Sequence, residues 1–169
     1  MVSDLKTRLL AVTATAAEYC QTIENCRDME RDDLVKSLLD SLPRLYLAFS
    51  DLAPEQELMS GENEFFSSYI DEDYYDSIRR SLEAVFGEED TFLETFEEDM
   101  KYSDTPIAAS ISESLADIFQ PLYDFISIVR ESDGDQAEGA YIECHDNFVQ
   151  YWSQTLCNVM RPLNRLRYS

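Results

Sequence analysis

The sequence has little of what most catalytic and metal-binding sites require. Its 169 residues include a single histidine, His145, and only four glycines. One histidine cannot supply the paired Glu-x-x-His motifs of a ferritin-like iron site. Four glycines are too few for a glycine-rich phosphate loop or for the turns of a many-stranded β fold. We therefore predict neither a cofactor nor a metal site, and the sequence favours a protein without catalytic residues.

The four cysteines also lack the spacing of a metal site or a redox motif. Cys20 and Cys26 are six residues apart, and Cys144 and Cys157 are thirteen apart. A zinc site needs a close pair such as Cys-x-x-Cys, because one short turn must aim two thiolates at the same ion. We predict free thiols on small, buried side chains. The acidic runs do not fit an EF-hand loop, which needs glycine at its sixth position and glutamate at its twelfth.

Long hydrophobic runs are absent, since no stretch approaches the roughly 18 to 20 apolar residues of a membrane span. A secretory signal is an alternative at the N-terminus, where Lys6 and Arg8 precede a short apolar stretch. That stretch belongs to an apolar stripe at steps of three and four residues, which continues past any cleavage site to Ile23. We predict a cytoplasmic protein that does not bind membranes.

What the sequence does contain is a repeated helical pattern of apolar residues, which make up 44% of the chain. The pattern predicts a helix over 4–25 with Ser3 as its N-cap. A second helix is predicted over 28–52, with a kink or break at Pro43, because proline removes a backbone donor and clashes with the preceding turn. Residues 55–63 are typical of a polar loop.

The middle of the chain carries clear helix boundaries. Asp71 is predicted to cap a third helix, and Gly87 occupies the position where a left-handed C-terminal cap is favoured. A shorter amphipathic piece is interpreted as a further helix because its apolar residues are four apart: Phe92, Phe96 and Met100.

Two long helices are predicted in the second half. Asp104 or Thr105 offers an N-cap oxygen, and Pro106 suits the first helical position, where no amide donor is needed. An apolar stripe then runs over 111–129 with a predicted bend at Pro121.

A turn at 132–135 precedes the final helix, predicted over 141–166 and kinked or ended at Pro162. No alternating pattern typical of strands competes with these stripes. We predict an all-α fold, an antiparallel bundle of about five to six helices with several kinks at proline, in one helical domain over 1–169.

His145 and its neighbour Cys144 suggest a base beside a nucleophile. Adjacent helical residues point about 100° apart, however, and His145 lies on the apolar stripe, which favours a packed histidine. A carboxylate-based enzyme or a metal-binding protein is an alternative. It would use Asp117 and Asp124, which are seven residues apart and so lie on one side of a helix. This alternative needs a concave pocket in which they meet His145 or a tyrosine.

Negative charge is concentrated in one segment. The chain has 35 acidic and 13 basic residues, a formal net charge of −22, and residues 51–99 hold 17 acids against two arginines. Such a field repels nucleic acid and anionic lipid and attracts basic proteins. We therefore predict an acidic interaction surface, hereafter the acidic surface, with these members: Asp71, Glu72, Asp73, Asp76, Glu88, Glu89, Asp90, Glu94, Glu97 and Glu98.

These features favour a non-catalytic protein–protein interaction module. The expected partner is another protein, and the charge favours a basic one; nucleic acid and membranes are not expected. An acidic inhibitor, an immunity-type protein or a DNA mimic that caps a basic partner is an alternative. An acidic surface that serves solubility alone is another. A homodimer is compatible with the many aromatic residues.

Several stretches resemble a bacterial family, the domain of unknown function 5063 family: Tyr75-Asp76-Ser77-Ile78, Phe86-Gly87-Glu88, Ser114-Leu115-Ala116-Asp117-Ile118-Phe119 and Tyr151-Trp152. The resemblance implies a small, acidic, all-helical protein and no assigned activity. The chain departs from the family pattern at Pro121, where the pattern has aspartate. It also reads Gln-Tyr-Trp-Ser-Gln-Thr over 150–155, where the pattern has His-Trp-Gly-x-His. Any metal or proton-transfer role of those histidines is therefore not expected here.

Overall fold

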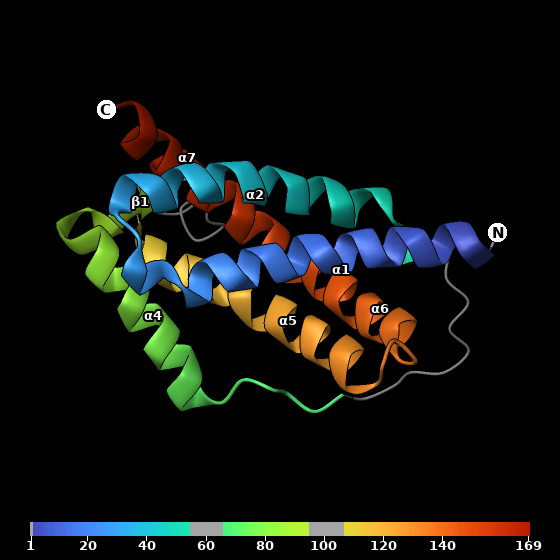
Figure 1. Cartoon of the computed structure of the whole chain (residues 1–169). Coiled ribbons are helices and arrows are strands. Elements are labelled where there is room, and N and C mark those ends of the chain that lie inside the picture. The colour runs from blue at the N-terminus through green and yellow to red at the C-terminus, as the bar shows by residue number, and fades with distance from the viewer. Residues whose placement is uncertain (1, 55–65, 95–106) are drawn as a thin grey trace.

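The first two helices form an antiparallel pair (Figure 1). A computed structural model describes the following residues: 2–54, 66–94 and 107–169. Helix α1 (Val2–Glu24) is followed by a short 3₁₀ turn (Cys26–Asp28) and by helix α2 (Arg31–Asp51), so both predicted helices are confirmed. Ser3 lies inside α1, so its prediction as the N-cap is wrong. Helix α2 continues on both sides of Pro43, so it is not broken there, and the kink remains a prediction.

Helix α4 (Glu72–Phe86) begins and ends where the sequence predicts. The carboxylate of Asp71 accepts a hydrogen bond from the Tyr74 amide at 2.7 Å, which satisfies a donor that the first turn leaves unpaired. Gly87 follows the helix with φ of 56°, a region that residues with a side chain rarely adopt. Both boundaries are confirmed.

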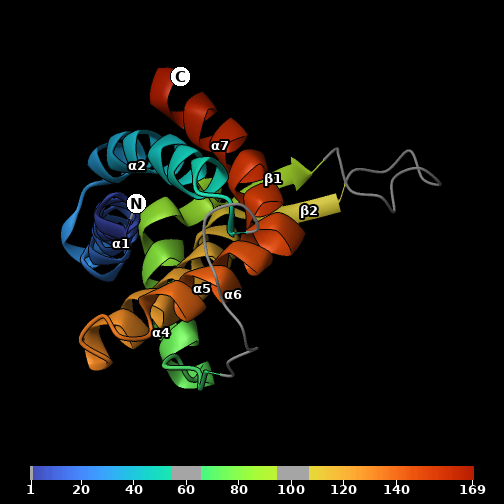
Figure 2. The same cartoon turned by 90° about the vertical axis from the view of Figure 1, so that its right-hand side faces the viewer.

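A two-stranded antiparallel sheet follows α4, and the sequence analysis does not predict it. After a 3₁₀ turn (Gly87–Asp90), strand β1 (Thr91–Glu94) pairs with strand β2 (Ile107–Ser110), with Thr91 opposite Ser110. The hairpin points away from the helices (Figure 2). The helix interpreted from Phe92 is therefore wrong, since this residue lies in β1. The strands are missed because four residues are too few for an alternating pattern to be recognised. The other two apolar residues of the predicted helix lie outside the described part of the chain: Phe96 and Met100.

Helix α5 (Ile111–Glu131) begins later than predicted. Its N-cap is Ser110, whose hydroxyl accepts a hydrogen bond from a first-turn amide at 2.9 Å. Since Ser110 is also the last residue of β2, the predicted start at Pro106 is wrong. A proline permits a helix to start but does not require it, whereas the apolar stripe does begin at Ile111. The predicted caps lie outside the described residues: Asp104 and Thr105.

The C-terminal part of the chain is one continuous helical run with an irregular turn in its middle. Helix α6 (Ala137–Asn147) leads into a π-helical turn (Phe148–Trp152), and helix α7 (Ser153–Tyr168) completes the run. The predicted turn at 132–135 precedes it. Pro162 lies inside α7 and does not end it. The apolar stripe predicts the long helix but not its π-helical turn.

Helix α5 forms the centre of the bundle. It packs against α1, α4, α6 and α7, while α2 lies against α1 and α7. Its apolar stripe is buried over most of its length, as predicted: Ile111, Leu115, Ile118, Leu122 and Phe125 are each at most 1% exposed, whereas Val129 at its end is partly buried. The helix continues past Pro121, where the bend remains a prediction.

Aromatic side chains fill the core where α2 meets the C-terminal run. The ring centroid of Phe49 lies 5.2 Å from that of Tyr141, 5.7 Å from that of Phe148 and 4.8 Å from that of Trp152. The Tyr141 hydroxyl donates to the carbonyl oxygen of Leu52 at 2.6 Å, just past the last turn of α2. This bond pairs a buried polar group, so the aromatic cluster holds the two segments together at little desolvation cost.

The described residues form five helical units, with α6, the π-helical turn and α7 counted as one. The predicted all-α bundle is confirmed, with the small hairpin as an addition. Within the described part, no helix combines the length and the apolar character that crossing a bilayer demands.

Candidate functional site

The acidic surface is divided between the two ends of α4. Asp71, Glu72 and Asp73 lie at the first turn of the helix, whereas Glu88 and Glu89 follow its last turn. The 15 residues of α4 span about 22 Å at about 1.5 Å per residue, so the two groups do not form one patch. Two further members lie outside the described residues: Glu97 and Glu98.

Two predicted members of the acidic surface are not on the surface. Asp90 and Glu94 are buried, so the prediction that they are available to a partner is wrong. The carboxylate of Asp90 accepts hydrogen bonds from the amide and from the hydroxyl of Ser112, each at 2.7 Å. Negative charge at the first turn of a helix is favoured by the helix dipole. Asp90 therefore anchors the start of α5.

Arginines offset other members of the acidic surface. The Asp76 carboxylate lies 3.6 Å from the Arg79 guanidinium and 3.8 Å from that of Arg80, and Glu89 forms an ion pair with Arg31. Such exposed pairs add little stability, but they reduce the local negative potential. The acidic surface is thus less negative than its ten acids suggest.

A polar groove lies where α5 faces the π-helical turn. Three hollows of ≈ 220, 270 and 380 Å³ share lining residues, so they adjoin one another along α5 and are treated together as one depression. This depression, hereafter the α5 groove, is lined at its centre by the following residues: Asp117, Gln120, Pro121, Asp124, Asn147, Tyr151 and Trp152. One end reaches 66–68 and Glu143, and the other reaches Gln154 and Asn158.

Asp124 binds the segment that enters α4. Its carboxylate accepts a hydrogen bond from the Tyr69 amide at 2.7 Å and another from the Ser68 hydroxyl at 3.2 Å. The side chain is partly buried, and loss of water around it raises its pKa above the usual range, although these hydrogen bonds lower it. Asp124 thus joins α5 to a segment 55 residues away in sequence.

Asp117 lies two turns earlier on the same side of α5. It accepts a short hydrogen bond of 2.5 Å from the Tyr75 hydroxyl of α4. Loss of surrounding water raises the pKa of Asp117, and burial together with the bond to Asp117 raises the pKa of the Tyr75 phenol far above 10. At neutral pH the tyrosine is therefore protonated, and its hydroxyl donates to the aspartate carboxylate. The two carboxylates lie in a concave site, and one of them meets a tyrosine, as the enzyme alternative requires.

The π-helical turn forms the opposite wall of the groove. Trp152 is buried and donates its indole N–H to the Cys144 carbonyl at 3.2 Å, which pairs a backbone oxygen beside the widened turn. Its neighbour Tyr151 is 67% exposed, so the ring is available to a partner. π-helical turns recur at functional sites, where they change the direction in which side chains point. Here the turn places a buried and an exposed aromatic side by side.

The described lining of the α5 groove contains three acids and no basic residue. Besides the two aspartates of α5, Glu143 lies at one end, and its pKa is raised by loss of water and by the nearby charges of Asp124 and Asp146. Amides supply most of the other polar groups: Gln120, Asn147, Gln150, Gln154 and Asn158. The site is therefore negative at neutral pH and rich in groups that both donate and accept hydrogen bonds.

Cys144 and His145, the thiol and the imidazole described near the groove, are both buried. Burial raises the pKa of Cys144 well above that of a free thiol, and its Sγ donates to the Pro121 carbonyl at 3.7 Å. A buried thiol of this kind is a poor nucleophile. His145 is buried between the rings of Tyr141 and Phe148, at 5.7 and 5.9 Å, so the predicted packed histidine is confirmed.

The cysteines are free thiols, and three of them are buried as predicted: Cys20, Cys26 and Cys144. Cys157 is exposed, so the prediction of burial is wrong for that residue. Among the described residues, no three or more His, Cys, Asp or Glu side chains are placed to hold one metal ion.

The sequence was compared with the profiles of known protein families. The sequence profile of one family matches residues 3–169, nearly the whole chain. The chain belongs to the family described as Domain of unknown function (DUF5063). The resemblance found in the sequence is confirmed. In this DUF5063 chain, the stretch over 150–155 that departs from the His-Trp-Gly-x-His pattern lies along the α5 groove.

A solved structure shares the DUF5063 fold. Protein BF1032 from Bacteroides fragilis, whose crystal structure was determined by the Northeast Structural Genomics Consortium, is 29% identical in sequence and matches with a TM-score of 0.80. The match covers 96% of this chain and 93% of that chain. No curated protein matches the sequence. The fold therefore extends over nearly the full length of both proteins, and neither description names an activity.

The spacing of Asp117 and Asp124 predicts that they share one side of a helix, but it does not predict the residues that surround them. Tyr75 and Tyr69 are 42 and 55 residues away from their carboxylate partners, and no local pattern links groups at such distances. The exposure of Tyr151 depends on the π-helical turn, which steps of three and four residues do not reveal. The spacing of the carboxylates predicts one wall of the groove only.

Proposed function

We propose that this DUF5063 protein is a non-catalytic module that binds another protein and takes a basic segment of that partner into the α5 groove. The observation that carries the proposal is the pair Asp117 and Asp124, held in a concave site whose described lining includes no basic residue. A basic side chain from a partner would supply the opposite charge that the groove lacks.

The electrostatics of the two carboxylates support a cationic ligand. Loss of surrounding water raises the pKa of both Asp117 and Asp124, which means that their ionised forms are less favourable than in water. A lysine or arginine placed between them would favour ionisation and lower both pKa values. Binding should then release protons and weaken as the pH falls through the raised pKa values of the free protein.

The remaining lining suits a peptide better than a small ion. Tyr151, 67% exposed, offers a ring face to a lysine or arginine through a cation–π contact. The amides of Gln120 and Asn147 can each donate to and accept from a peptide backbone. These contacts explain how the groove would select an extended basic segment over a free cation.

The acidic surface around α4 supports a binding role less well. Its members lie at opposite ends of a helix about 22 Å long, and arginines pair with Asp76 and Glu89. An inhibitor or DNA mimic needs a continuous face of negative charge to match a basic partner. The α5 groove offers a more compact arrangement, so we place the partner there.

The proposal is tested with the double variant Asp117→Asn/Asp124→Asn. Asparagine keeps an oxygen that can accept the bonds from Tyr75 and Tyr69, so the fold is retained while two charges are removed. The full-length protein is immobilised, and lysate proteins are captured at 0.05 and 0.5 M NaCl. We expect a partner that binds the wild type at low salt and is lost from the double variant.

The matched control is Glu72→Gln/Asp73→Asn, which removes two exposed charges from the acidic surface. Retention of the partner by this control locates binding in the groove. Loss of the partner from the control, with retention by the groove variant, would place binding at α4 and refute the groove. Equal weakening of both variants would show that only net charge matters.

A further inference from the structure

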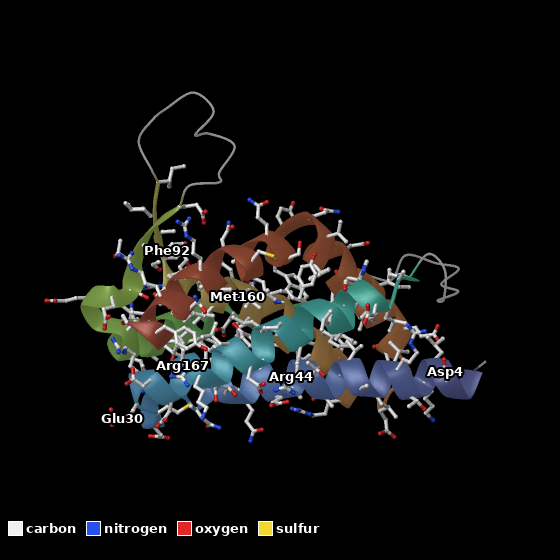
Figure 3. All side chains as sticks on the ribbon, turned by 90° about the horizontal axis from the view of Figure 1, so that it is seen from above. Asp4, Glu30, Arg44, Phe92, Met160 and Arg167 are labelled. Atoms are coloured by element: carbon white, nitrogen blue, oxygen red, sulfur yellow. The ribbon has the colours of Figure 1, made fainter. Side chains whose placement is uncertain are left out.

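A second cleft lies between β1 and the last turns of α7. Its volume is ≈ 830 Å³, within the range of ligand and peptide sites. Phe92 of the hairpin lies beside α7 when the molecule is viewed from above (Figure 3). The cleft is bordered by strand and helix residues that include Thr91, Phe92, Leu93, Arg161 and Arg165.

The cleft follows the edge of β1. Successive residues of a strand point to opposite faces of the sheet, so a hollow over one face would contact only every second residue. Here three consecutive residues, Thr91, Phe92 and Leu93, border the cleft, and no described residue of β2 does. The hollow therefore runs along the side of β1 that faces away from β2.

That edge is suited to backbone pairing. Within the described part of the chain, each strand of this two-stranded sheet has one partner, and alternate residues direct their N–H and C=O groups to the other side. Leu93 is 61% exposed on the same strand, so an apolar side chain accompanies the open edge. Exposed edges of this kind accept an added strand from another protein.

The helix wall of the cleft has the opposite charge to the rest of the protein. Arg161 and Arg165 are four residues apart on α7, so they lie on one side of the helix, and both are exposed. Residues 148–169 contain three arginines and no acid, in a chain of net charge −22. Glu89 also borders the cleft, but its carboxylate forms an ion pair with Arg31.

We propose that this cleft binds an extended acidic segment of a partner protein, which adds a strand to the free edge of β1 and places its carboxylates against Arg161 and Arg165. The segment alternates acidic and apolar residues. Its acidic side chains point toward α7, and its apolar side chains lie on the face of the sheet where Leu93 is exposed. This site is separate from the α5 groove and has the opposite charge preference.

Charge decides against a second copy of the chain as the occupant. Two molecules of net charge −22 repel each other, whereas a short acidic segment of a larger partner carries only a few charges to the arginines. Guanidinium groups form strong, directional hydrogen bonds with carboxylates, which fixes the register of the added strand.

The test uses a fluorescein-labelled octapeptide of alternating glutamate and valine, titrated with the full-length protein at 0.1 M NaCl and followed by fluorescence anisotropy. We expect saturable binding that weakens about tenfold or more for the Arg161→Gln/Arg165→Gln variant. The same loss is expected for a peptide with glutamine in place of glutamate. The control Lys36→Gln/Arg130→Gln removes two exposed positive charges elsewhere and should leave the affinity unchanged.

A second measurement tests the added strand. Two further peptides are methylated at the backbone nitrogens of every second residue, one at the odd and one at the even positions, which removes hydrogen-bond donors without changing the charge. Only one of the two sets of nitrogens would face β1, so one of these peptides should no longer bind. Hydrogen exchange of the Thr91–Glu94 amides should slow in the complex. The proposal is overturned by an absence of saturable binding, by equal affinity of the glutamine peptide, or by full binding of both methylated peptides. A dimer in sedimentation that the Arg161→Gln/Arg165→Gln variant dissolves would show that a second copy occupies the cleft.

Discussion

At the scale of single residues, the carboxylates of α5 have two roles. Asp117 and Asp124 each tie a distant segment to the central helix, through Tyr75 and through the Tyr69 amide. Their surroundings nevertheless disfavour ionisation, since loss of water raises both pKa values. The two side chains therefore connect segments of the fold, and a cation bound beside them would stabilise their ionised forms.

The raised pKa values predict the direction of a pH effect on stability. A carboxyl group whose pKa is higher in the folded than in the unfolded protein binds protons more tightly when folded, so the free energy of unfolding increases as the pH falls through the raised value. We expect the midpoint of thermal unfolding to increase as the pH is lowered from neutral towards the ordinary range of aspartate, and to increase less in Asp117→Asn/Asp124→Asn. Differential scanning calorimetry measures both changes.

The pair Glu72→Gln/Asp73→Asn serves as the control, because it removes the same number of charges at exposed positions. Its pH dependence should stay close to that of the wild type. Equal slopes for the wild type and the α5 variant would contradict the role assigned to these two carboxylates.

At the scale of elements, sequence patterns predict the long helices and miss the short features between them. The stripe from Ile111 to Val129 marks the buried face of α5, and Asp71 and Gly87 mark the two ends of α4 through local backbone chemistry. The hairpin has too few residues per strand to show a period, and its pairing depends on contact between segments. The α5 groove likewise depends on contacts between segments far apart in sequence, so only its aspartates could be predicted.

The junction between the hairpin and α5 depends on Asp90. Its carboxylate is buried and accepts two hydrogen bonds from Ser112, so Asp90→Ala leaves a buried amide and a hydroxyl without their partner. We expect this variant to lower the free energy of unfolding by about 2 kcal/mol. Urea unfolding followed by circular dichroism provides the measurement. Glu88→Ala, at an exposed position two residues earlier, should change stability by less than about 0.5 kcal/mol.

At the scale of the whole molecule, helices with a predominantly acidic exterior surround one apolar core. The described buried residues of α1, α2, α4, α5 and α7 belong to a single cluster, and the single domain over 1–169 stays a prediction. The formal net charge of −22 opposes compaction, since like charges are brought closer together on folding. Packing of the core must overcome this repulsion.

Salt should therefore stabilise the protein. The Debye length falls from about 30 Å at 0.01 M to about 3 Å at 1 M, which screens repulsion between surface carboxylates. We expect the unfolding midpoint to increase as NaCl is raised over this range, in a single transition. A midpoint that stays constant or decreases would mean that the ion pairs of Arg31, Arg44 and Arg79 already balance the surface.

The position of Trp152 gives the molecule an intrinsic optical probe. It is the only tryptophan in the chain, it lines the α5 groove, and its indole is fixed by a hydrogen bond and by the ring of Phe49. Emission from a single indole reports changes in local polarity without a dye or an added label. Any molecule that enters the groove should shift or quench this emission, so candidate partners can be screened with the unmodified protein in a cuvette.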